Sequence, residues 1–92
     1  MAKSGADRPH SDEPDRDEIV ATFGANLKAA RLKMGLTQAQ LAEAAGLLQQ
    51  YVSLVESGKQ NVTLTTAETL AKVVNRDVRM LLARPRPRPL KG

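Results

Sequence analysis

The amino-acid sequence predicts an all-α fold of five helices, with a disordered tail at each end. Apolar residues recur at steps of three and four through residues 17–83, as they do on the buried faces of helices. Residues 1–16 and 84–92 instead contain prolines and few large apolar side chains, which is typical of segments that do not fold. A chain of 92 residues has room for one such domain between its tails.

The first predicted helix runs from about Asp17 to Met34. Acidic residues lie at its start, where the helix dipole favours negative charge, and Gly35 follows its end. Its expected buried stripe consists of Val20, Phe23, Leu27, Ala30 and Met34.

Two short helices are predicted next, on either side of Gly46. Thr37 suits the N-cap of the second helix, and the third runs from about Gln49 to Ser57. Their inward residues are Leu41, Ala42 and Ala45 on the first, and Leu47, Val52 and Val55 on the second. Because so few residues separate them, the helices must cross steeply around Ala42. This spacing is that of a helix-turn-helix, so duplex DNA is the first partner to consider.

The same stretch resembles the phage-repressor, Cro and Xre-type helix-turn-helix regulators. Their first helix and turn look like GLTQAQLAEAAGL, their recognition helix and loop like QQYVSLVESGKQN, and the next helix like LTTAETLAKVV. The resemblance spans roughly residues 20–82. It implies a compact lambda-repressor-like domain and a sequence-specific, double-stranded-DNA-binding transcriptional regulator. A helical bundle without a ligand would explain the apolar spacing, but not the outward glutamine pair, Gln49 and Gln50, at the start of the third helix.

Two more helices complete the expected fold. Thr63 can cap a fourth helix that runs through Val74, and Asn75 stands where the family usually ends this helix with glycine. The inward residues of this helix are Leu64, Ala67, Leu70, Ala71 and Val74. Residues 77–83 fit either a last helical turn or an alternating strand, and the resemblance favours the helix.

Charge is distributed unevenly along the chain. Residues 1–18 carry three basic and six acidic side chains, a net charge of −3. Since the whole chain has a net charge of +4, the remainder carries +7. A basic domain behind an acidic leader suits a polyanionic partner, although a solvated basic surface explains the charge equally well.

Several classes of function are disfavoured by composition. The chain has no cysteine, no apolar run long enough for a membrane span, and a single histidine, His10, in the leader. We therefore expect a soluble protein of the cytoplasm, associated with the nucleoid and not with membranes. One tyrosine, one phenylalanine and no tryptophan are too few for a single-stranded nucleic-acid module. No catalytic set can be assembled, so we expect no enzyme, no cofactor and no metal.

The predicted DNA-base contacts lie on the third helix. Gln49 and Gln50 are at its N-terminal end, where a glutamine amide can pair with adenine N6 and N7 in the major groove. Ser53 and Leu54 lie one turn further on, where they can meet a base edge, a phosphate or a thymine methyl group. Solvated side chains are the alternative interpretation, more so for Ser53 and Leu54.

Two positions depart from the family pattern. The family commonly has serine or threonine at position 48 and arginine, lysine or glutamine at position 54, whereas this chain has Leu48 and Leu54. Leucine has no oxygen to accept the free N–H groups of a helix start. We therefore expect the first turn of the recognition helix to be weakly held until DNA binds.

The resemblance also implies contacts to phosphates and a structural ion pair. Gln38 matches the family's phosphate-binding glutamine, and Thr37 precedes it at the same helix start. The remaining predicted phosphate contacts are Lys59, Gln60 and Asn61. In the family, residues equivalent to Arg31 and Glu56 form a partly buried ion pair between the first and third helices.

One DNA-binding domain buries too little surface for tight operator binding, and members of the family therefore bind a palindromic operator as a symmetric dimer. The apolar residues available for the dimer interface are Val78, Met80, Leu81 and Leu82, although these could instead complete the monomer core. Whether the chain has a toxin or another protein as partner stays open, because it could be an antitoxin or the controller of a restriction-modification system. An interaction module without DNA binding is the alternative class.

From Arg84 onward we expect an extended basic tail, either solvated or following DNA.

Overall fold

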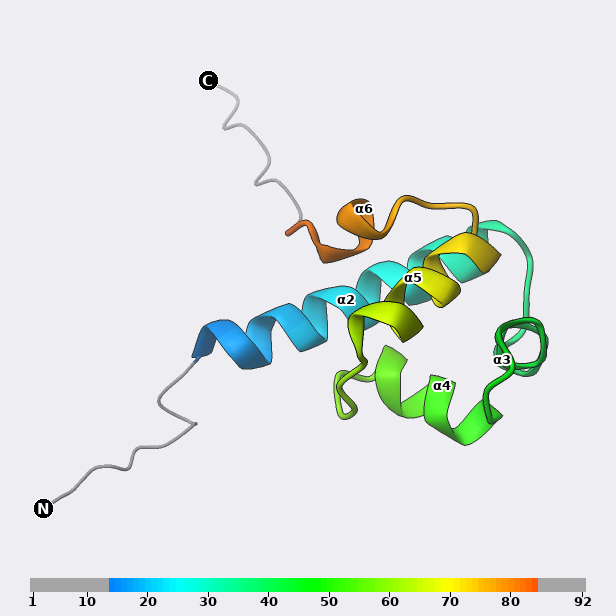
Figure 1. Ribbon diagram of the computed structural model, residues 1–92, viewed down its shortest axis with the longest axis horizontal. Coiled ribbons are helices and arrows are strands. Elements are labelled where there is room, and N and C mark those ends of the chain that lie inside the picture. The colour runs from blue at the N-terminus through cyan, green and yellow to red at the C-terminus, as the bar shows by residue number, and fades with distance from the viewer. Residues whose placement is uncertain (1–13, 85–92) are drawn as a thin grey trace, which may run out of the picture.

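The computed structural model describes residues 14–84, which form five helices labelled α2 to α6 (Figure 1). Their bounds are Pro14–Lys33 for α2, Gln38–Ala45 for α3, Gln49–Glu56 for α4, Leu64–Val73 for α5 and Val78–Leu82 for α6. No strand occurs within residues 14–84, so the predicted all-α fold is confirmed and residues 77–83 contain a helix.

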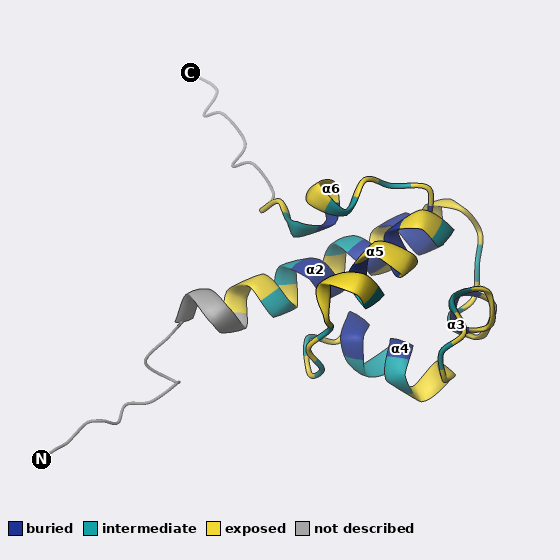
Figure 2. Cartoon of the chain, viewed as in Figure 1, coloured by how far each residue is buried: buried dark blue, intermediate teal, exposed yellow. Residues whose placement is uncertain are grey.

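The long helix α2 is the axis of the domain. It packs against α4 and α6, while α3 packs against α4 and α5. In Figure 1, α6 lies above α2, α4 lies below it and α3 lies at the right, while α5 overlaps α2 in this view. Figure 2 shows that the buried faces of these helices turn toward one another. The core they enclose consists of Phe23, Leu27, Ala30, Leu41, Ala42, Val52, Val55, Ala67, Leu70, Ala71, Val74 and Leu81.

Helix α2 begins earlier than predicted, at Pro14 instead of Asp17. Proline is well suited to the first helical position because its fixed φ is helical and its missing N–H would have no partner there. Residues 14–16 of the predicted leader thus belong to α2, and the rest of the leader, residues 1–13, lies outside the described residues. Residues 85–92 of the predicted basic tail also lie outside them.

The buried stripe of α2 ends one turn before the predicted position. Met34 is 47% exposed, so its predicted burial is wrong. The helix stops at Lys33, and Met34 lies in the turn that leads through Gly35, which has φ +75. The helix therefore ends before Met34, so the Met34 side chain does not continue the buried face of α2.

The caps of α3 and α4 are those that the sequence predicts. The Thr37 hydroxyl accepts a hydrogen bond from the backbone N–H of Gln40, and the Gln40 side chain accepts one from the backbone N–H of Thr37. Gly46 ends α3 in the left-handed conformation, with φ 73. Leu48 occupies the N-cap of α4 and makes no side-chain capping bond. The two short helices thus have one well-capped start and one bare start.

The last two helices follow the prediction with one exception. Thr63 caps α5, and Asn75 adopts the left-handed conformation with φ 58. Leu64, however, is 81% exposed, so its predicted inward orientation is wrong. As the first residue of α5, it lies at the edge of the domain, where no neighbouring helix covers it closely.

Candidate nucleic-acid interface

Helix α4 has an outward polar face and an inward packed face. Gln49 and Gln50, its first two residues, are exposed. Val52, Val55 and Glu56 are buried on the opposite side. The hydrogen-bonding amides are therefore presented to solvent by a helix whose other face is fixed against the core.

The residues one turn further along α4 are less accessible. Ser53 and Leu54 are both half-buried. Tyr51 is half-buried as well, and its hydroxyl donates to the backbone oxygen of Asn61 at 3.3 Å. Burial raises the pKa of the Tyr51 hydroxyl above its ordinary value of 10.0, so the group is protonated at neutral pH, as any tyrosine is, and can donate this bond. Tyr51 thus ties α4 to the following loop.

A buried ion pair joins the end of α2 to the end of α4. Arg31 Nε donates to Glu56 Oε2 at 2.7 Å, and Arg31 Nη2 donates to Glu56 Oε1 at 3.0 Å. Both side chains are at most 8% exposed. The third guanidinium nitrogen donates to the Leu36 carbonyl at 2.8 Å, so Arg31 also fixes the turn that leads into α3. This geometry is bidentate, which holds the relative angle of the helices as well as their distance.

Gln38 belongs to the same network. Its Nε2 donates to Glu56 Oε1 at 3.0 Å, so the residue expected at a phosphate is also bonded to the buried carboxylate. An amide nitrogen carries two hydrogens, which leaves a second donor for an anionic oxygen. Gln38 therefore connects the ion pair to the surface at the start of α3.

The remaining predicted phosphate contacts surround these helices. Thr37 is exposed at the start of α3, where its hydroxyl caps the helix. After α4, Lys59 and Asn61 are exposed, and Gln60 is half-buried with its Nε2 donating to the Asn61 backbone oxygen at 3.2 Å. Each of these side chains reaches solvent close to one end of α3 or α4.

Gly24 is a positioning residue that the sequence analysis did not single out. A β-carbon at Gly24 would collide with the carbonyl oxygen of Val55 and lie 3.0 Å from that of Glu56. Gly58 makes a similar approach, since a β-carbon there would lie 3.3 Å from the Cα of Ala21. Backbone therefore meets backbone where α2 crosses the end of α4. A glycine inside a predicted helix was the available signal.

Asn26 is a second residue that the sequence analysis missed. Its Nδ2 donates to the carbonyl oxygens of Leu81 and Ala83, both at 2.9 Å, at the end of α6. The last carbonyls of a helix have no partner within it, so this amide satisfies acceptors that would otherwise need water. Asn26 thereby holds α6 on α2. Nothing in the local sequence distinguishes it from an exposed asparagine.

The four residues predicted for a dimer interface have different environments. Met80 is 60% exposed, whereas Val78 and Leu82 are half-buried. Leu81 is only 2% exposed and belongs to the monomer core, so its side chain does not reach the surface. A monomer already uses part of this apolar set, as the alternative interpretation had it.

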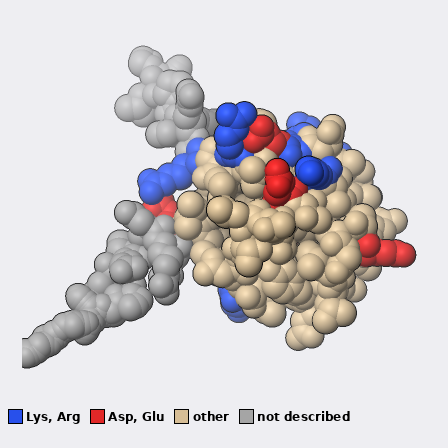
Figure 3. Space-filling view, in the orientation of Figure 1, with Lys and Arg blue, Asp and Glu red and all other residues tan. Residues whose placement is uncertain are grey.

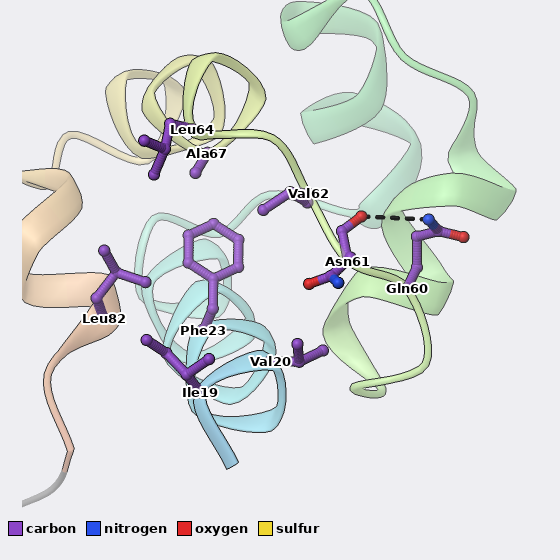
Figure 4. A pocket seen from close by; sticks show the side chains of 9 residues that line it. All are labelled: Ile19, Val20, Phe23, Gln60, Asn61, Val62, Leu64, Ala67 and Leu82. Carbon is purple, nitrogen blue, oxygen red and sulfur yellow. Dashed lines mark hydrogen bonds between the residues drawn. The ribbon is translucent and has the colours of Figure 1, made fainter. Parts of the chain in front are cut away.

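An apolar pocket adjoins α6 on the side of the α2 start (Figure 4). Its volume is about 170 Å³, and its lining comes from α2, α5, α6 and the loop before α5. The lining residues are Ile19, Val20, Phe23, Gln60, Asn61, Val62, Leu64, Ala67 and Leu82. Ile19 and Leu64 lie at its rim and are 47% and 81% exposed. Two large apolar side chains of the lining, Ile19 and Leu64, are therefore accessible to solvent.

Charged side chains are sparse around α3 and α4. Residues 34–63 contain only Glu43, Glu56 and Lys59 as charged residues, and Glu56 is paired with Arg31. In Figure 3 most of the charged side chains on the visible face gather along the side of α5 and α6, and few lie over α3 and α4. The surface of α4 is therefore built for hydrogen bonds and apolar contacts more than for charge.

Neither a metal centre nor a membrane span is found in residues 14–84. No group of at least three His, Cys, Asp or Glu side chains in this range is arranged to hold a metal ion. None of its helices combines the length and apolar character that crossing a membrane requires.

Comparison with known proteins gives this geometry its context. A family model described as helix-turn-helix matches residues 27–81. The control protein C.SmaI of Serratia marcescens is 40% identical over 77% of this chain and 89% of its own length. The restriction-modification controller protein C.AhdI of Aeromonas hydrophila has a similar crystal structure, with a TM-score of 0.65 and 37% identity over 67% of this chain and 94% of its own. SinR, the master regulator for biofilm formation, solved in complex with DNA, has a TM-score of 0.63 and 31% identity over 66% of this chain and 98% of its own. The chain belongs to the helix-turn-helix family of Xre-, Cro- and C-protein-type DNA-binding transcription regulators, which are not enzymes.

Proposed function

We propose that this regulator binds a palindromic operator as a homodimer and reads its sequence by inserting α4 into the major groove. The observation that carries this proposal is the division of α4 into two faces. Gln49 and Gln50 are exposed at its start, while Val55 and Glu56 fix its other end against α2. A reading helix needs both properties, free hydrogen-bonding groups and a fixed angle.

The contacts follow from the positions of the side chains. Gln49 and Gln50 pair with base edges, for which adenine N6 and N7 are the best match. Ser53 and Leu54 contribute at the margin of the same face. Phosphate contacts come from the starts and ends of the short helices, through Thr37, Gln38, Lys59, Gln60 and Asn61. These contacts set the register of α4 on the duplex.

Selection of an operator from random duplex DNA, followed by substitution of the glutamines, tests the reading role. Gln49→Ala and Gln50→Ala should each weaken binding to the selected operator by about 1–3 kcal/mol. Binding to random duplex should change little, because phosphate contacts supply most of it. Glu68→Gln, at an exposed position on α5, is the control. Unchanged operator affinity in both glutamine variants would remove α4 from this role.

We place the dimer interface on the exposed side of α6 and along the adjoining pocket. Met80 is the most exposed apolar residue of α6, and Leu82 continues into the apolar rim formed by Ile19 and Leu64. Leu81 supports this surface from within the core. Burial of large apolar side chains on both copies would supply a hydrophobic driving force for association.

Sedimentation equilibrium tests this interface. Met80→Asp should shift the protein toward the monomer, since a carboxylate would have to lose its water in the interface. Met34→Asp is a matched control, because Met34 is also an exposed methionine, at 47%, and lies in the turn after α2 and not in α6. A dimer that survives Met80→Asp unchanged would place the interface elsewhere.

A controller of a restriction-modification system, acting on DNA in the cytoplasm, is the biological role that we favour. Two of the relatives found are control or controller proteins, and they match most of their own length. The operator selected in vitro should then lie upstream of modification and endonuclease genes beside this gene. A toxin gene in that place would instead support an antitoxin, with the toxin as partner. Failure to retard any duplex in an electrophoretic mobility assay would support an interaction module.

A further inference from the structure

Leu48 is among the most exposed apolar residues of the domain, at the point where α4 begins. Its relative exposure is 77%, and it immediately precedes the exposed pair Gln49 and Gln50. It occupies the N-cap with φ −80 and ψ 145, and its side chain makes no capping bond. An apolar side chain therefore stands beside the hydrogen-bonding amides of α4.

Both properties of Leu48 are unfavourable in the free protein. A serine or threonine at this position would accept a hydrogen bond from a free backbone N–H at the start of α4, as Thr37 does for α3. The leucine side chain also gains nothing from packing while it stays exposed to water. A partner that covers the Leu48 side chain would remove it from water and so offset the second of these costs.

The surroundings of Leu48 favour a DNA base as that partner. Residues 34–63 carry few charges, so the exposed face of α4 would distinguish one DNA sequence from another through hydrogen bonds and apolar contacts. The major groove presents one apolar group on its base edges, the C5-methyl group of thymine. Adenine, which the glutamines suit, is always paired with thymine, so a methyl group lies in the same base pair as each adenine contact.

We propose that Leu48 is a specificity-determining residue that packs against a thymine methyl group next to the base pairs contacted by Gln49 and Gln50. This inference rests on the proposed major-groove function of α4. It adds an apolar contact at a position where a capping side chain would be expected.

Replacement of thymine by deoxyuracil in the selected operator tests the contact, because it removes only the methyl group. Binding of the full-length protein is measured with each thymine of the half-sites replaced in turn. At one position, wild type should lose about fourfold in affinity per substituted half-site, the value of one buried methylene-sized group. Leu48→Ser should bind the thymine and deoxyuracil operators equally, whereas Leu48→Met should keep most of the preference. Leu32→Ser, at a leucine 56% exposed on α2, should behave as wild type.

Thermal unfolding of the free protein separates recognition from folding. Leu48→Ser should raise the melting temperature, because it adds the missing cap and removes an exposed leucine. A lower melting temperature would mean that Leu48 packs in the free protein and would overturn the proposal.

The remaining outcomes are also decisive. A specific operator on which wild type tolerates deoxyuracil everywhere would overturn the Leu48 contact and leave the proposed function intact. The same result follows if Leu48→Ser keeps the preference for thymine, since another residue would then read the methyl group. Failure to select any operator would end the proposed function, and this inference with it.

Discussion

Gly24 of α2 lies directly against the backbone carbonyl of Val55 near the end of α4, with no room for a β-carbon between them. Helix α4 is therefore held at a distance that only glycine permits. In Gly24→Ala the added methyl group forces the two helices apart, which should cost about 1–3 kcal/mol of the free energy of unfolding. Alanine also has a helix propensity about 1 kcal/mol better than glycine, so the net loss should be smaller than this steric cost. Urea unfolding measures the net effect.

Ala25→Ser is the control for this substitution, at the exposed neighbouring position of α2. It should change stability by less than about 0.5 kcal/mol. A Gly24→Ala variant more stable than wild type would show that the helices adjust without cost.

Removal of one partner of the Arg31–Glu56 pair should be more costly than replacement of both. Arg31→Ala leaves the Glu56 carboxylate buried without its main partner, and a loss of about 3–5 kcal/mol is expected. The double variant Arg31→Met with Glu56→Leu should recover much of this stability, since two apolar side chains need no counter-charge. Thermal unfolding of the single and double variants measures the difference. Additive losses would argue against coupling between the two side chains.

Asn26→Ala should loosen α6. The substitution removes the donor to the carbonyl oxygens of Leu81 and Ala83, at an expected cost of about 0.5–1.5 kcal/mol, since water can reach the exposed one. In Asn26→Ala, the amides of α6 should exchange faster than they do in wild type. Exchange in α3 should stay unchanged, because α3 does not depend on this side chain. Asn26→Asp should be more destabilising than Asn26→Ala, because a carboxylate would face those same carbonyls. Equal protection of α6 in all three proteins would contradict the role assigned to Asn26.

The N-cap of α6 should respond to acid in a defined range. Side-chain hydrogen bonds from Arg79 lower the pKa of Asp77 from 3.8 to about 2, and the backbone N–H of Arg79 contributes further. Since the folded-state pKa is lowered, the stabilising contribution is complete above pH 3.8 and is lost as the pH falls through about 2. A carboxyl titration followed by NMR should therefore have its midpoint near 2. Asp77→Asn keeps a capping oxygen and removes the titration, and a midpoint near 3.8 in wild type would rule out the interaction.

Local signals in the sequence predicted most helix ends. Thr37 and Thr63 cap their helices, and Gly46 and Asn75 adopt left-handed conformations, because each effect depends on one residue and its immediate neighbours. The bare N-cap at Leu48 was predicted for the same reason. Such features require no knowledge of how the helices pack.

Features that depend on packing were harder to predict. Periodicity assigned Met34 and Leu64 to the core, but Met34 lies in the turn after α2 and Leu64 is the first residue of α5, and both are exposed. Gly24 and Asn26 act on segments that are distant in the sequence, α4 and α6. Their partners are fixed by the crossing of α2 with those helices, which a single sequence does not specify. The exposed glutamines of α4 were found because the helix-turn-helix spacing itself determines their face.

The two faces of α4 alternate within eight residues, and this has a consequence for how the protein can change. Val52, Val55 and Glu56 carry the folding role, whereas Gln49 and Gln50 lie outside the packed set. Substitutions at the exposed positions therefore have little effect on folding, so under the proposed role of α4 new operator preferences would arise by single mutations without loss of the domain. The same separation makes α4 suitable for redesign, because a library at the exposed positions can be screened on an unchanged scaffold.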